Sequence, residues 1–153
     1  MEIALYQPDI APNVGTLIRL GACMGTPVHI IEPCGFPFGA KDLRRAVMDY
    51  SQIAKVTRHS SWEAFCRATK HQRHVLLTTK SAVSYTDYSF TNTDILLLGR
   101  ESAGVPETVH ESCIGKVTIP MKSEARSVNV ALAASMVLGE ALRQTDGFPS
   151  QIF

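Results

Sequence analysis

Three short stretches of this chain combine glycine or proline with polar and charged side chains that could do chemistry. Each lies near the end of an apolar run, where open α/β sheets place their ligand sites. They are PNVGTLIR with Asn13 and Arg19, GRESAGVP with Glu101, and IPMKSEARSVN with Ser127 and Asn129. Simpler explanations exist, because Asn13 and Ser127 can cap helices and GRESAGVP can form a strand-to-helix turn. Such a turn does not require Glu101, and the three signals together predict a binding site.

The spacing of Gly99 and Gly104 begins like a phosphate-binding P-loop. A P-loop would continue with lysine and then serine or threonine. Here Val105 and Pro106 follow, and Glu101 stands where a phosphate would lie. The missing lysine argues against a nucleotide-binding α/β protein, although the sequence alone leaves this alternative open.

Other catalytic classes lack their motifs. The histidines show no H-E-x-x-H or related spacing, so we expect no metal site. No G-x-S-x-G follows a strand-like run, which argues against a Ser-His-Asp hydrolase. The four cysteines form no C-x-x-C pair, and we interpret them as reduced, mostly buried thiols of a cytoplasmic protein.

The composition predicts a single domain over residues 1–153, with a loose tail from about residue 147. Hydrophobic residues make up 45% and charged residues 19%, and the net charge is +1. Any nucleic-acid contact must therefore come from a local basic patch. The N-terminus has no basic signal-peptide region, and no apolar run approaches the roughly 18 residues of a membrane span, so we expect no membrane partner.

Short apolar runs alternate with helix-like segments, which predicts an α/β domain with a mainly parallel six-stranded sheet and helices on both faces. The expected strands are 3–6, 28–31, 53–56, 75–78, 95–98 and 117–119. The expected helices are 13–24, 43–48, 60–69 with Ser60 as cap, 106–112 and 127–143. Small residues surround most of the last helix, so we expect it to be enclosed on more than one side.

A basic segment, KDLRR, contains Lys41, Arg44 and Arg45 and follows the loop PCGFPFGA. Aromatic rings beside cations in a flexible loop suit single-stranded RNA, whose unstacked bases stack on such faces. We therefore predict RNA contacts at these three cations.

In order and content, the three polar stretches resemble the three-motif signature of the SPOUT superfamily of RNA methyltransferases. The shared pattern is N-x-G-x-x-x-R, then L-L-G-R-E-S-A-G-V-P, then I-P-M-x-x-x-x-R-S-x-N. Within the superfamily, the chain is similar to the small single-domain tRNA 2′-O-methyltransferases that modify the wobble nucleotide, position 34, of leucine tRNAs. The likeness covers nearly the whole chain, including ALYQPDIAPNVGTLIRL, HIIEPCGF and KDLRRAVMDY.

The resemblance implies a deep C-terminal trefoil knot, which the general rules of chain topology would not predict. It also implies S-adenosylmethionine (AdoMet) as cofactor, held largely by backbone groups, with S-adenosylhomocysteine as product and no metal. The residues that match the family's cofactor pocket are Leu77, Thr78, Gly99, Glu101, Gly104, Ile119, Met121 and Ser127. Glycines in such a pocket let the main chain approach the ligand closely.

The resemblance assigns catalysis to Arg19, with Asn13, Glu101, Ser127 and Asn129 holding cofactor and substrate. A free guanidinium is a poor general base because it stays protonated at neutral pH. Unless the site makes it release a proton, we expect Arg19 to bind the adjacent phosphate or to stabilise the developing alkoxide. Arg126 is a second expected phosphate contact, and the expected partner is tRNA rather than DNA.

Members of the family act as homodimers, and we expect an interface on the first and last helices, with Arg19 facing the partner's cofactor. The interface candidates are Leu17, Leu20, Met24, Met136, Val137 and Leu142. Arg100 departs from the wobble enzymes, where proline is expected, and is a further candidate RNA contact. Two alternatives stay open: a ribose target elsewhere in tRNA or rRNA, and an RNA-binding knot protein without activity.

Overall fold

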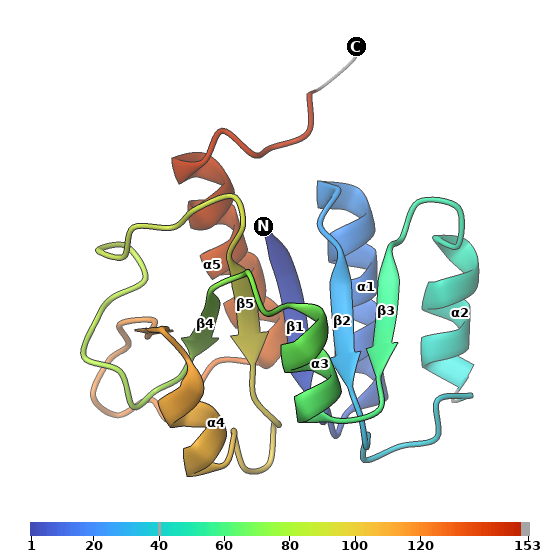
Figure 1. Ribbon diagram of the computed structural model, residues 1–153, viewed down its shortest axis with the longest axis horizontal. Helices are drawn as coiled ribbons and strands as arrows, with labels where there is room; N and C mark the ends of the chain where they lie inside the picture. The colour runs from blue at the N-terminus through green and yellow to red at the C-terminus, as the bar shows by residue number, and fades with distance from the viewer. Residues whose placement is uncertain (40, 151–153) are drawn as a thin grey trace.

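The computed structural model, which describes residues 1–39 and 41–150, is built around a six-stranded sheet (Figure 1). The strands are β1 (Glu2–Tyr6), β2 (Val28–Ile31), β3 (Val56–His59), β4 (His74–Leu77), β5 (Ile95–Leu98) and β6 (Gly115–Val117). The helices are α1 (Ala11–Met24), α2 (Lys41–Asp49), α3 (Trp62–Ala68), α4 (Glu107–Ser112) and α5 (Val130–Gln144). Neighbouring strands pair in parallel in the order β3-β2-β1-β5-β4-β6, which confirms the predicted sheet.

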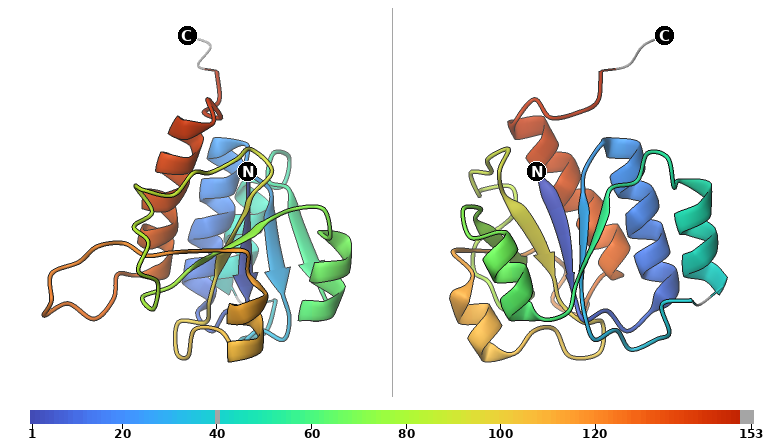
Figure 2. Two further views of the ribbon diagram at one scale, coloured as in Figure 1. Left: turned by 60° about the vertical axis from the view of Figure 1, so that its left-hand side comes forward. Right: turned by 45° about the vertical axis from the view of Figure 1, so that its right-hand side comes forward.

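Helices cover both faces of the sheet, as predicted (Figure 2). Residues of α1, α2 and α5 pack with Leu96 and Leu98 of β5 into the larger core. Residues of α3 and α4 pack with Ile95 and Leu97 into a smaller core on the other face. Strand β5 is apolar throughout because its successive side chains alternate between two buried faces.

Several predicted element boundaries are wrong, among them those of the third strand, the third helix and the last strand. The third strand is Val56–His59 rather than 53–56, and Ile53 lies in a turn with 59% of its surface exposed. Helix α3 is capped by Ser61 rather than Ser60, because the Ser61 hydroxyl accepts a hydrogen bond from the Ala64 N–H at 3.1 Å. The last strand is Gly115–Val117 rather than 117–119, because its pairing with β4 covers only those residues.

The cysteines are all free, but the prediction that most are buried is wrong. Only Cys113 is buried, Cys34 and Cys66 are half-buried, and Cys23 is exposed on α1. No helix of residues 1–39 and 41–150 is long and apolar enough to cross a membrane. In the same residues, no group of three or more His, Cys, Asp and Glu side chains could hold a metal ion.

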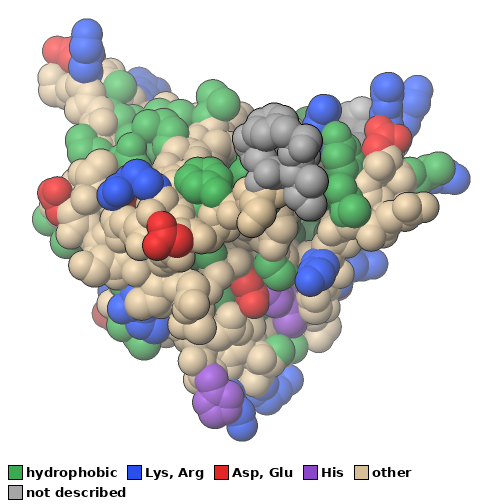
Figure 3. All heavy atoms as spheres, turned by 90° about the horizontal axis from the view of Figure 1, so that it is seen from above, with side chains coloured by type: hydrophobic (Ala, Val, Ile, Leu, Met, Phe, Trp, Pro, Cys, Tyr) green, Lys and Arg blue, Asp and Glu red, His purple; other side chains and the backbone are tan. Residues whose placement is uncertain are grey.

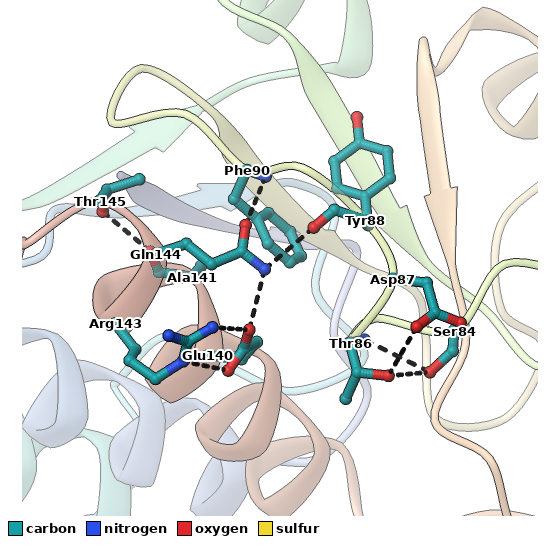
Figure 4. Close-up of polar contacts among 10 residues, drawn as sticks. All are labelled: Ser84, Thr86, Asp87, Tyr88, Phe90, Glu140, Ala141, Arg143, Gln144 and Thr145. Atoms are coloured by element: carbon teal, nitrogen blue, oxygen red, sulfur yellow. Dashed lines mark hydrogen bonds and ion pairs between the residues drawn. The ribbon is translucent and has the colours of Figure 1, made fainter.

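The connection between β4 and β5, residues 78–94, lies against the C-terminal part of the chain. Thr118, just after β6, forms two backbone hydrogen bonds with this connection. On α5, the Gln144 side chain accepts from the Phe90 N–H at 2.9 Å and donates to the Tyr88 carbonyl at 3.0 Å (Figure 4). The 78–94 connection is thus bonded both to the chain just after β6 and to the end of α5. This arrangement is consistent with the expected knot, which stays a prediction.

Helix α5 is enclosed on more than one side, as predicted, because it packs on α1 and β5 and contacts the 78–94 connection. Beyond α5, the Gly147 N–H still bonds to the Leu142 carbonyl at 2.9 Å. Residues 151–153 of the expected loose tail lie outside the described residues.

Three histidines lie around the buried Phe65 of α3. His29 stands between Glu2 and His59, with its Nε2 2.6 Å from a Glu2 oxygen and its Nδ1 2.8 Å from His59 Nε2. Burial, and secondarily the neighbouring His29, lowers the pKa of both His59 and His74. The fold therefore favours the neutral form of both rings.

We expect the free energy of unfolding to decrease as the pH falls below about 6.5, where histidines of the unfolded chain take up protons. The folded protein binds these protons only at lower pH, because the pKa values of His59 and His74 are lowered. Urea unfolding at pH 7.5, 6.5 and 5.5 measures the effect. His59→Gln should flatten this pH dependence, and an equal slope in the variant would contradict the assignment.

Candidate active site

A cavity of about 520 Å³ opens at the carboxyl ends of the central strands. Its walls come from the segments after β1, β4, β5 and β6 and from the start of α5. The strand order changes direction between β1 and β5, and ligands of open α/β sheets bind at such a switch point. The volume lies within the range of about 300–1,000 Å³ typical of small-molecule sites.

All the residues that the resemblance assigns to the cofactor pocket line this cavity. They are Leu77, Thr78, Gly99, Glu101, Gly104, Ile119, Met121 and Ser127. Asn13 and Asn129 line it too. The fold therefore brings the three polar stretches together, and cofactor contact by these residues stays a prediction.

The loop after β5 requires glycine at two positions. Arg100 and Gly104 exchange two backbone hydrogen bonds, of 2.9 and 2.8 Å, which close the loop into a tight turn. Gly104 has a φ of +65°, a conformation that side chains disfavour. A Cβ atom on Gly99 would lie only 2.8 Å from the Gly104 main chain. The two glycines thus let the backbone fold tightly beside the cavity.

A chain of hydrogen bonds joins the three polar stretches. Glu101 accepts from the Asp9 N–H at 2.9 Å and from the Asn13 side-chain amide at 3.2 Å. The Asn129 amide in turn donates to the Asn13 side-chain oxygen at 3.1 Å. Residues from three distant parts of the sequence therefore hold one another in place at the cavity wall.

Two capping predictions are wrong, and both corrections matter for the cavity. Helix α1 begins at Ala11 with Pro12 in its first positions, so Asn13 is not the cap and its amide is free to bond Glu101. Helix α5 is capped by Asn129 rather than Ser127, because the Asn129 oxygen accepts from two helix N–H groups. Ser127 instead lies in an exposed loop that lines the cavity.

Arg100 is held by the turn between β1 and α1. Its guanidinium donates to Asp9 at 2.9 and 3.3 Å, and Ser102 also donates to this carboxylate. The bonds from Ser102 and Arg100 lower the pKa of Asp9 to about 2. Arg100 thus fastens the glycine loop to the neighbouring turn, and its RNA contact stays a prediction.

Arg19 does not line the cavity. It is exposed on α1, and its guanidinium carbon lies 5.4 Å from the centre of the Tyr50 ring. Arg19 lies six positions after Asn13 on the helix, a rise of about 9 Å and a rotation of about 240°. One protomer therefore cannot direct both side chains into the same cavity through this helix.

The other predicted RNA contacts lie on the surface. Lys41, Arg44 and Arg45 are exposed on α2, and Arg126 lines a second hollow of about 400 Å³ that adjoins the cavity through shared residues. Figure 3 shows the face at the amino ends of the strands, where Lys and Arg side chains are scattered. Among the residues that the structure describes, the Lys and Arg side chains of that face are spread over several places rather than gathered in one patch.

The aromatic loop before α2 differs from expectation. Phe36 and Phe38 are half-buried and pack against the larger core. The cation over the Phe38 ring is Arg58 of β3, at 3.8 Å, rather than a residue of KDLRR. The rings are therefore less available to bases than the sequence pattern predicts.

Several cavity residues were missed by the sequence analysis. They include Ile10, Lys80, His110, Val130 and Ala133. Lys80 could have been found, because it follows Thr78 at the carboxyl end of a predicted strand. His110 carries no motif, and only the packing of α4 brings it to the cavity.

The sequence matches the SpoU rRNA Methylase family over residues 1–139. The chain belongs to this family. It is a methyltransferase, and the resemblance found in the sequence is confirmed. A tRNA (cytidine(34)-2′-O)-methyltransferase of Ancylobacter novellus is 56% identical to this SpoU methylase over 150 residues, 97% of this chain and 95% of the relative. The enzyme of the same name from Escherichia coli K12 is 41% identical over 154 residues, 99% and 98% of the two chains.

Solved structures agree with the fold of this SpoU methylase. A structure described as giving insights into the 2-OH methylation of C/U34 on tRNA matches with a TM-score of 0.88 and 35% identity, covering 94% of both chains. An AdoMet-bound rRNA methyltransferase from Sinorhizobium meliloti matches with a TM-score of 0.82 and 26% identity. That match covers 93% of this chain but 55% of the larger protein.

Proposed function

We propose that this SpoU methylase transfers a methyl group from AdoMet to the ribose 2′-hydroxyl of nucleotide 34 in tRNA. Leucine isoacceptors are the expected substrates, bound through the anticodon stem-loop in the cytoplasm. The observation that carries the proposal is the convergence of all three polar stretches on one cavity, joined through Glu101, Asn13 and Asn129. The names of the two relatives over nearly the full chain support the choice of nucleotide.

The residues around the cavity fit AdoMet. Apolar side chains such as Leu77, Ile119 and Met121 suit a nucleoside, and the glycine loop offers backbone groups. Glu101 is a carboxylate that suits a cationic or hydroxyl-bearing group of the ligand. AdoMet, when bound, supplies the methyl group from its sulfonium. AdoMet carries no phosphate, so the site does not need the lysine that binds phosphate in a P-loop.

The protein's own contribution is positioning and electrostatics. A weak hydroxyl nucleophile must meet the methyl group in line, and orientation of two reactants can supply roughly 7–11 kcal/mol. The Glu101, Asn13 and Asn129 network fixes the cavity wall before the substrate arrives. Arg19 binds the adjacent phosphate or stabilises the alkoxide. Since Arg19 does not line its own cavity, it acts on the cavity of a partner protomer.

The homodimer that this requires must use surfaces left exposed on α1 and α5. The prediction of Leu17, Val137 and Leu142 as interface residues is wrong, because the protomer's own core buries them. Leu20 and Met24 are half-buried and Met136 is 44% exposed. Leu132, one turn before Met136, is 61% exposed and was not foreseen. An apolar stripe at this spacing is typical of a helix face that packs on a partner.

Leu132→Glu combined with Met136→Glu is expected to convert the dimer into monomers and to remove activity, because charges would be buried at the interface. Light scattering after size-exclusion chromatography measures the mass. Ile114→Glu is the control, since Ile114 is 74% exposed and lies outside α1 and α5. A double variant that stays dimeric would place the interface elsewhere.

Incubation with methyl-labelled AdoMet and leucine tRNA transcripts tests the proposed function. We expect label on the ribose of nucleotide 34, located by nuclease digestion and mass spectrometry. Label on a base, or on another nucleotide, would contradict the proposed reaction. Transcripts of other tRNAs and of rRNA fragments are the comparison, because they represent the alternative ribose targets.

A further inference from the structure

Asp9, in the turn between β1 and α1, is bonded to three consecutive residues of the glycine loop. Its carboxylate accepts from the Arg100 guanidinium at 2.9 and 3.3 Å, and from the N–H and the hydroxyl of Ser102. Its own N–H donates to a carboxylate oxygen of Glu101 at 2.9 Å. Arg100 and Glu101 line the cavity, whereas Asp9 does not. Asp9 therefore holds part of the cavity wall from outside.

The side chains of Arg100 and Glu101 converge on Asp9 with opposite charges. Arg100 bonds to the carboxylate of Asp9, and Glu101 bonds to its main chain. The hydrogen bond to Asp9 is the main cause that raises the pKa of Arg100, and the charge of Glu101 adds to it. The guanidinium thus lies within electrostatic reach of both carboxylates and is bonded to that of Asp9.

The Glu101 carboxylate is occupied at both of its oxygens. One accepts from the Asp9 N–H, and the other accepts from the Asn13 amide at 3.2 Å. A guanidinium binds a carboxylate through two parallel bonds, which use both oxygens at once. An Arg100 side chain released from Asp9 would therefore compete with Asn13 for Glu101 and would turn this carboxylate away from the network at the cavity wall.

We propose that Asp9 is a positioning residue that keeps Arg100 from pairing with Glu101, so that Glu101 stays bonded to Asn13 at the cavity wall. Asp9 acts through Glu101 and does not itself touch the cofactor. The inference rests on the proposed function, because it takes AdoMet as the ligand of the cavity and Glu101 as one of the residues that hold it.

Titration calorimetry of AdoMet with the wild-type protein and Asp9→Asn is the first test. Asparagine keeps the shape of the side chain, one oxygen for Ser102 and the N–H for Glu101. It loses the negative charge that holds Arg100. We expect AdoMet binding to weaken roughly three- to tenfold, the size of one hydrogen bond to a site residue. The unfolding temperature should stay close to that of the wild type, because the bonds within the turn remain.

A second substitution at Arg100 distinguishes this role from a simple tie between turn and loop. Adding Arg100→Ala to Asp9→Asn removes the competing cation and should restore AdoMet affinity to within twofold of wild type. Adding Arg100→Lys to Asp9→Asn keeps a cation and should leave binding weak. If Asp9 only tied the turn to the loop, loss of the Arg100 side chain would bring no recovery.

Asp9→Asn that binds AdoMet within twofold of wild type would overturn the proposal and leave the proposed function intact. The same holds if Asp9→Asn with Arg100→Ala binds as weakly as Asp9→Asn alone. Equal recovery with Arg100→Lys would also overturn the proposal, because the competing charge would still be present. Wild-type protein that binds no AdoMet would instead overturn the proposed function.

Discussion

Replacing Arg19 by alanine is expected to lower methyl transfer at least about 100-fold, because the substrate would lose the cation that orients or stabilises its reacting oxygen. AdoMet affinity should stay within a few fold, since Arg19 does not line its own protomer's cavity. Single-turnover transfer and calorimetry measure the two quantities. Arg19→Lys keeps the charge without the planar fork and should be intermediate. A large loss of AdoMet binding would place Arg19 in the cofactor pocket.

Mixed dimers distinguish action of Arg19 on its own protomer's cavity from action on the partner's cavity. One protomer carries Arg19→Ala, and the other carries a damaged cavity. If Arg19 acts on the partner's cavity, the mixed dimer regains activity, because its one intact cavity faces its one intact arginine. Mixed dimers as inactive as either parent would contradict action across the interface.

Gly99→Ala provides the damaged cavity and is the second large effect. Its Cβ would lie 2.8 Å from the Cα and carbonyl carbon of Gly104, which cannot move without breaking the turn's two backbone hydrogen bonds. We expect AdoMet affinity to fall at least about 100-fold, since main-chain displacement moves several ligand-binding groups at once. Calorimetry measures the loss, and the unfolding temperature reports any damage to the fold.

Gly39→Ala is the matched control. No atom lies within 4 Å of a Cβ built at Gly39, and the residue lies outside the cavity. It should bind AdoMet as wild type does. If Gly99→Ala also bound AdoMet normally, the tight turn of the glycine loop would not be required for cofactor binding.

Much of this architecture follows from local sequence patterns. The run Ile95–Leu98 is apolar at every position, and the structure explains this by its place between two cores. The first residue of a helix was harder to predict where two neighbouring residues could each cap it. Ser60 and Ser61 are adjacent candidates, and only the bond from Ala64 shows which one caps α3. At α1, proline starts the helix earlier than Asn13 could, which leaves Asn13 for the site.

Some residues of the site could likewise be predicted from the sequence, and others could not. Its glycines, Glu101 and Asn129 could be predicted, because their types and order carry the family resemblance. His110 could not, because a single histidine on a short helix has no pattern and reaches the cavity through packing of α4 alone. The exposure of Leu132 and the burial of Leu17 could not be predicted either, since both are leucines on helices rich in apolar residues, and residue type alone does not tell which leucine faces outward.

A leucine tRNA transcript with 2′-deoxyribose at nucleotide 34 tests the central claim most directly. The change removes one hydroxyl and leaves every base and phosphate in place. We predict full label from AdoMet on the unmodified transcript and none on the deoxy transcript, although both bind the protein. Equal labelling of the two transcripts would show that the methyl group goes elsewhere and would contradict the proposed reaction.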